Sequence, residues 1–190
     1  MTDNKDSILA HNQSQHKIWL DEQKNAQVVQ EVHLRADDLS IVYPIILYAN
    51  GLDREKADDV FYWCGYVGVP KNHCLYSASL DWGMDGLENV YGVVHGGITY
   101  AGRKALIPKY NFIGFDCAHS GDFIKSEHKD CEYEMLTFVT KDKVFDDCIN
   151  LVKYLSNEQK LYLTEKAESK FISDNESIIK ITSKGDSSEQ

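Results

Sequence analysis

The sequence predicts an α+β fold in which a mainly antiparallel sheet packs against a C-terminal amphipathic helix, with an extra helix at the N-terminal end. Short segments rich in Val, Ile, aromatic residues and Gly fill the centre of the chain and are typical of β-strands. Apolar residues recur at helical spacing from Val144 to Leu155. With 190 residues, 43% of them hydrophobic, the chain suits one folded domain with extensions.

The N-terminal third is predicted to contain a helix and two strands. Residues 1–12 are polar and are expected to be disordered, whereas 13–30 is predicted to form a short amphipathic helix. Residues 31–35 form a candidate strand, and 36–38 form a turn or the start of a helix. The branched residues of the apolar run 41–49 favour a strand after its proline, although a buried helix gives the same pattern.

The centre of the chain is predicted to form the sheet. The candidate strands are Phe61–Val69, Val90–Ala101, Tyr110–Ala118 and Glu134–Val139. Residues 71–89, between the first two, show little periodicity, and loops of this length in compact domains tend to be functional. Within this loop His73 is expected to be exposed to solvent or part of a lid.

A helix of about residues 141–157 follows, with Thr140 as its N-cap. Its apolar face comprises Val144, Phe145, Cys148, Leu151, Val152 and Leu155. Beyond residue 163 the chain is polar, and Ile178–Ile181 is a candidate edge strand. The predicted organisation is therefore a disordered start (1–12), a helical and extended segment (13–60), an α+β core (61–163) and a polar extension (164–190).

Composition limits the classes of partner. The formal net charge is −10 and only three residues are arginine, so we expect no nucleic-acid polymer as a partner, although a pocket can still bind a small anion. The first residues show no basic region followed by an apolar run, so we expect no secretory signal. No apolar run approaches the roughly 18–20 residues that span a bilayer. We expect a cytoplasmic protein with reduced cysteines at positions 64, 74, 117, 131 and 148.

Glycine and histidine indicate where a site lies. Ten of the twelve glycines fall between Gly65 and Asp122, and glycine lets a backbone approach another group closely. His95 and His119 lie in the same stretch, beside acidic residues and a cysteine. We therefore predict a small-molecule site at the ends of the two central strands.

One candidate chemistry is a cysteine nucleophile activated by a histidine. If the second and third central strands pair antiparallel in a symmetric register, His95 lies opposite Phe115 and diagonal to Cys117 on one face. His95 would then lower the pKa of Cys117, with an acid such as Asp122 or Asp81 orienting the ring. A register shift of one residue makes Asp116 the partner instead. The alternative is that Cys117 is a small core residue.

The second candidate chemistry is a divalent metal site. His95, Asp116, His119 and Asp122 offer the imidazole and carboxylate donors that suit zinc, manganese or iron, although no tight spacing defines the set. For His119 and its neighbours the alternative is a turn whose polar side chains cap the backbone. The candidate ligand-binding residues are Tyr66, Gly68, Gly96, Gly97, Tyr100 and Arg103, the last as a clamp for phosphate or carboxylate.

Three motifs carry a resemblance. The chain contains GYVGVP at 65–70, HGGITY at 95–100 and GFDCAH at 114–119, the last followed by Asp122. In this order they resemble a group of small, mostly uncharacterised proteins of bacteriophages and bacterial genomes. The resemblance implies a phage or prophage context, and therefore a role in the cytosol of the infected cell.

Three functions are compatible with these features. The first is an enzyme, a hydrolase or transferase, that acts on a small polar ligand through the cysteine or the His and Asp residues, with nucleotide-derived molecules among the candidate ligands. The second is a phage counter-defence protein that binds and sequesters a nucleotide immune signal without turnover. The third is an acidic inhibitor of a protein partner. The sequence contains no Walker, dinucleotide-binding, serine-elbow or HExxH motif.

Overall fold

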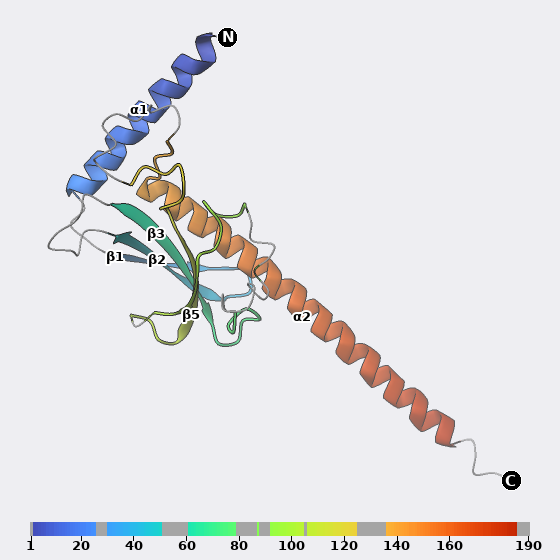
Figure 1. Cartoon of the computed structure of the whole chain (residues 1–190). Coiled ribbons are helices and arrows are strands. Elements are labelled where there is room, and N and C mark those ends of the chain that lie inside the picture. The colour runs from blue at the N-terminus through green and yellow to red at the C-terminus, as the bar shows by residue number, and fades with distance from the viewer. Residues whose placement is uncertain are drawn as a thin grey trace.

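The chain folds as an antiparallel sheet with one helix at each end of the sequence, which confirms the α+β prediction (Figure 1). The structure is a computed structural model that describes residues 2–25, 30–50, 61–78, 87, 92–104, 106–124 and 136–185. The five strands lie in the order β1-β2-β3-β5-β4. The elements are α1 (Thr2–Asn25), β1 (Gln30–Ala36), β2 (Val42–Asn50), β3 (Tyr62–Pro70), β4 (Tyr100–Arg103), β5 (Tyr110–Asp116) and α2 (Lys141–Gly185).

The two faces of the sheet differ because side chains alternate along each strand. On one face, Trp63, Val67 and Phe115 pack with α2 in the hydrophobic core. A Cβ on Gly65 of β3 would lie 2.7 Å from the Cys148 sulfur, so this glycine allows α2 to approach the sheet closely. The candidate site residues described below lie in the loop before β4 and in the turn after β5.

Helix α2 begins as predicted but is much longer than predicted. The backbone N–H of Lys143 donates to the Thr140 hydroxyl, and the predicted apolar face is buried in the core. The helix runs to Gly185, because no glycine or proline interrupts residues 141–184. It crosses the predicted boundary at 163/164 without a break, and the edge strand predicted at Ile178–Ile181 is wrong, since these residues are helical.

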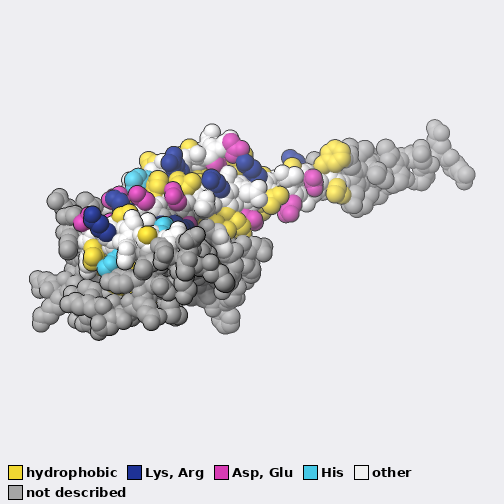
Figure 2. Space-filling model, turned by 90° about the horizontal axis from the view of Figure 1, so that it is seen from above, with side chains coloured by type: hydrophobic (Ala, Val, Ile, Leu, Met, Phe, Trp, Pro, Cys, Tyr) yellow, Lys and Arg dark blue, Asp and Glu magenta, His cyan; other side chains and the backbone are white. Residues whose placement is uncertain are grey.

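The distal part of α2 projects from the body of the molecule (Figure 1). All side chains from 161 to 173 are exposed, and Phe171 is 71% exposed. Hydrophobic side chains alternate with charged ones along this helix (Figure 2). Within the described part of the chain, no helix is long and apolar enough to cross a membrane.

Helix α1 begins at Thr2, so the prediction of disorder over 1–12 is wrong. The first 43 residues contain neither glycine nor proline, and a helix anchored by tertiary contacts extends at little cost per residue. Its anchors are Trp19, which is 1% exposed, and Glu22. Glu22 accepts hydrogen bonds from the Trp63 indole at 2.7 Å and from the backbone N–H of Lys141 at 3.0 Å, which fixes α1 beside the start of α2.

The strand predicted at Val90–Ala101 is wrong for most of its length. Residues 90 and 91 lie outside the described residues, and only the last two residues of the prediction belong to β4. Between them the chain forms turns and irregular backbone, with positive φ at Gly92, Gly96 and Gly97. Tyr100 pairs with Gly114 across the β4–β5 ladder. The predicted strand Glu134–Val139 begins outside the described residues, and of its described part only Thr137 forms an isolated bridge, to Asp122.

Candidate functional site

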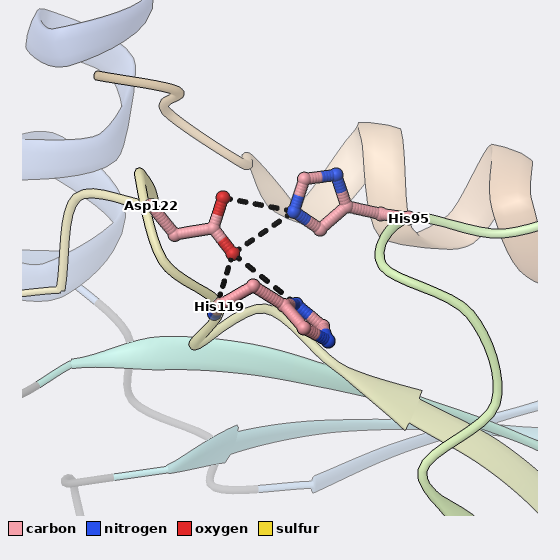
Figure 3. A group of neighbouring side chains, drawn as sticks. All are labelled: His95, His119 and Asp122. Atoms are coloured by element: carbon pink, nitrogen blue, oxygen red, sulfur yellow. Dashed lines mark hydrogen bonds and ion pairs between the residues drawn. The ribbon is translucent and has the colours of Figure 1, made fainter. Parts of the chain in front are cut away.

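Two predicted site residues, His95 and His119, point their rings at the carboxylate of a third, Asp122 (Figure 3). The Nε2 atom of His95 lies 2.9 Å from both carboxylate oxygens of Asp122, and the Nδ1 atom of His119 lies 3.4 Å from Asp122 Oδ2. Taking one donor atom from each side chain, these atoms all lie within 4.8 Å of one another. We call this group the His–His–Asp cluster.

A tight turn after β5 positions two members of the cluster. The backbone N–H of Asp122 donates to the carbonyl of His119 at 2.9 Å, and the backbone N–H of His119 donates to Asp122 Oδ2 at 2.8 Å. Gly121, between them, has φ +95°, a conformation that side-chain-bearing residues rarely adopt. The turn therefore points the Asp122 carboxylate back at the His119 backbone and side chain.

The loop before β4 brings His95 to the same point. Its backbone N–H donates to Asp147 Oδ2 of α2 at 3.2 Å, so the loop is fixed to the helix. A Cβ on Gly96 would lie 2.0 Å from Cε1 of the His119 ring. Only glycine at this position leaves room for the His119 ring beside the loop.

The electrostatics of the cluster follow from its contacts. Burial alone would raise the pKa of Asp122, but hydrogen bonds from the His95 ring and the His119 backbone outweigh burial and hold this pKa below its usual range. The hydrogen bond to Asp122 raises the pKa of His95. The His119 Nδ1 atom is buried and has no hydrogen-bond partner among the described residues. A buried imidazole nitrogen facing a carboxylate is a suitable position for a cation.

His95 also lines a cavity of about 460 Å³. Its other walls come from α1, from the segment before α2 and from the first turn of α2, through His11, Asn12, Gln15, Thr137 and Lys143 among others. Sequence reasoning missed these residues. His11 and Gln15 precede the buried Trp19 by eight and four residues, so extending the helix back from Trp19 would have placed them on its inner face.

The predicted cysteine and its acidic neighbour do not join the cluster. Cys117 is 2% exposed in the α2-covered core, and burial raises the pKa of its thiol, so it remains protonated at neutral pH. Asp116 points to the opposite face and accepts a hydrogen bond from the Thr99 hydroxyl at 2.7 Å. Both predicted registers of His95 are wrong, because His95 lies in a loop and its ring contacts Asp122.

The predicted ligand-binding residues separate into two groups. Gly96 and Gly97 lie in the His95 loop, whereas Tyr66, Gly68, Tyr100 and Arg103 lie on β3 and β4, away from the cluster. The Tyr66 and Tyr100 rings contact each other, and the Lys104 ammonium lies over both. A Cβ on Gly68 would contact Pro44 and Phe112 on that face.

His73 corrects another expectation, because it is neither exposed nor part of a lid. It is 4% exposed, its Nε2 donates to the Leu155 carbonyl at 3.1 Å, and its Nδ1 accepts the backbone N–H of Leu75 at 3.1 Å. Burial lowers its pKa. The ring thus connects the loop after β3 to α2 and serves the fold.

Comparison with protein-family models, curated proteins and solved structures finds no match to this chain. Its chemistry must therefore be argued from the site itself. Two imidazoles and one carboxylate form a donor set that zinc, manganese and iron accept.

Proposed function

We propose that the protein is an enzyme, a hydrolase or transferase, that uses a divalent metal ion held by His95, His119 and Asp122 to act on a small polar molecule. The observation that carries this proposal is the convergence of three donor atoms, two imidazole nitrogens and one carboxylate oxygen, within 4.8 Å. The Nδ1 atom of His119 contacts Asp122 Oδ2 at 3.4 Å but has no hydrogen-bond partner among the described residues. The cavity beside His95 supplies space for the substrate.

Three protein ligands leave the other coordination positions of a bound ion to water or substrate, which is typical of catalytic rather than structural metal sites. A divalent ion held by these three side chains would supply Lewis-acid chemistry to a substrate oxygen or a water molecule. The protein contributes a fixed ligand geometry. Asp147 holds the His95 loop, and the His119–Asp122 turn holds the other two ligands.

Metal binding tests the first half of the proposal. The protein is freed of metal by a chelator and titrated with Co²⁺, and visible absorption bands report coordination by nitrogen and oxygen. We expect the wild type to bind one equivalent and His119→Ala to bind at least about 100-fold more weakly, since even outer-sphere changes reduce affinity 10- to 100-fold. The control is His11→Ala, which removes an imidazole from the cavity wall and leaves the three ligands. Equal binding by both variants would contradict the site.

Turnover tests the second half. The metal-loaded protein is incubated with a small-molecule extract of bacterial cells, and the mixture is compared by mass spectrometry with one that contains Asp122→Asn. We expect at least one small polar metabolite to be consumed only by the wild type. If a compound is bound and returned chemically unchanged, the protein is not an enzyme for that compound. The result would then favour the second hypothesis, a counter-defence protein that sequesters its ligand. A nucleotide-derived substrate, a cytoplasmic location and a phage or prophage context remain part of this proposal.

A further inference from the structure

The wall of the cavity differs from the rest of the molecule in charge. The chain has 30 acidic residues and a formal net charge of −10. Yet no aspartate or glutamate is among the described residues that line the cavity, which include Lys143, His11 and the amides of Asn12 and Gln15. The rest of the wall is apolar, from Leu136, Phe138 and Val139, or carries the His95 ring and the Thr137 hydroxyl. One ammonium with imidazoles and amides, and no carboxylate among the described lining residues, suits a negatively charged ligand.

Lys143 is the cationic group of this wall with a fixed position. Its ammonium donates to Asp147 Oδ1 one turn along α2, and the same carboxylate accepts the backbone N–H of His95 through Oδ2. The Asp147 side chain is 3% exposed, whereas that of Lys143 is 55% exposed. Asp147 is therefore a positioning residue that holds both Lys143 and the His95 loop, and it leaves donors of the ammonium directed to solvent.

The N-terminus of α2 does not itself provide the anion site. The backbone N–H of Lys141 is bonded to Glu22, and that of Lys143 to the Thr140 hydroxyl. The Lys143 side chain is the group of this first turn that lines the cavity.

We propose that the cavity binds an anionic oxygen group of the substrate, a phosphate or a carboxylate, between the Lys143 ammonium and the metal ion of the His–His–Asp cluster. This inference rests on the proposed function. Two neutral imidazoles and one carboxylate leave a bound divalent ion with a net positive charge, so the anion would have a cation on each side. The Gln15 side chain of α1 also lines this cavity and carries an amide donor.

The test uses inorganic phosphate and acetate as probes, titrated calorimetrically into protein loaded with one equivalent of Co²⁺. The variants are Lys143→Met and the matched control Lys153→Met, which removes an exposed lysine of α2 outside the cavity. We expect Lys143→Met to weaken anion binding about 10-fold, as for loss of one charge-assisted hydrogen bond, and Lys153→Met to leave it unchanged. Lys143→Arg should restore most of the affinity because it keeps the charge near Asp147.

The outcomes separate the two proposals. Tighter binding of phosphate than acetate assigns a phosphate group to the substrate, and the reverse assigns a carboxylate. If Co²⁺ binds but neither anion does, or if Lys143→Met binds anions as tightly as Lys153→Met, the anion site is wrong and the metal site stands. If the wild type binds no Co²⁺, the proposed function fails and this inference fails with it.

Discussion

His73 and the pair His95 and His119 lie in two contrasting environments, one that stabilises the fold and one that forms the candidate metal site. His73 is buried, and both of its ring nitrogens are bonded to backbone groups, Nε2 to the Leu155 carbonyl and Nδ1 to the Leu75 N–H. His95 and His119 meet at the Asp122 carboxylate, and the Nδ1 atom of His119 has no hydrogen-bond partner among the described residues. A fully bonded ring stabilises the fold, whereas an unbonded nitrogen beside a carboxylate can bind something else.

The two environments also shift the imidazole pKa in opposite directions. Burial lowers the pKa of His73, while the hydrogen bond to Asp122 raises that of His95. Burial of a histidine alone therefore does not identify a site. What distinguishes the His–His–Asp cluster is that two imidazole rings meet at one carboxylate.

The largest effect is expected from Asp122→Asn. This change removes the carboxylate that both imidazoles face, and we expect metal affinity to fall at least about 100-fold, measured by competition with a chromophoric chelator. Asp116→Asn is the matched control, because Asp116 bonds to Thr99 outside the cluster. A similar loss in both variants would show that net charge rather than coordination decides binding.

His73→Ala should act on the fold and leave the site intact. It removes the partners of the Leu155 carbonyl and the Leu75 N–H and leaves a cavity in the protein. We expect the free energy of unfolding to fall by about 2–4 kcal/mol in urea titrations. Metal affinity of the folded protein should remain within about twofold of the wild type. If His73→Ala kept full stability but bound metal more weakly, His73 would belong to the metal site rather than to the fold.

A comparison of Gly96→Ala with Gly92→Ala distinguishes the effect of backbone strain from the effect of displacing the His119 ring. Both glycines have positive φ, so alanine is strained at either position. Only at position 96 would the new Cβ overlap the His119 ring, since nothing lies within 4 Å of a Cβ on Gly92. We expect metal affinity to fall about 10-fold for Gly96→Ala alone, by the same chelator competition. Equal effects at the two positions would argue against a precise placement of His119.

The pH dependence of stability, compared between the wild type and His73→Gln, reports the ionisation of His73. Because its pKa is lowered in the folded state, the unfolded chain binds the proton more readily, and stability should fall as the pH drops below about 6.5. The slope for one group reaches at most about 1.4 kcal/mol per pH unit. His73→Gln cannot titrate, so its stability curve in metal-free buffer should approach that of the wild type as the pH falls from 7 to 5. Parallel curves would show that the pKa of His73 is the same in the folded and unfolded states, contrary to the effect of burial.

The smallest effect is expected from Cys117→Ala. The thiol is buried and its pKa is raised, and within the described residues it makes no side-chain hydrogen bond to the cluster. We expect metal affinity within about twofold of the wild type, with a modest loss of stability from the missing sulfur. If this variant retained metal binding but lost metabolite turnover, the hypothesis that Cys117 is the nucleophile would be supported again.

Local patterns in the sequence were sufficient for several elements. The aromatic and β-branched runs predicted β3 and β5 nearly to the residue, and Thr140 with the spacing from Val144 to Leu155 predicted the start and the buried face of α2. The glycine-rich stretch correctly located His95, His119 and Asp122 near one another. These features follow from propensity, periodicity and capping, which depend on neighbours in the sequence.

Other features depend on contacts that no local pattern contains. Alternation along β5 sends Asp116 and Cys117 to opposite faces, but only the packing of α2 decides that the Cys117 face is the core. Turns rather than a strand bring His95 to Asp122, because Gly96 leaves room for the His119 ring. Residues 11–15 and Lys143 are more than 120 positions apart, and they line one cavity because Trp19 and Glu22 fasten α1 beside α2. The sequence by itself thus determined the elements and the reactive residues, and the long-range packing of the helices on the sheet decided which of those residues meet.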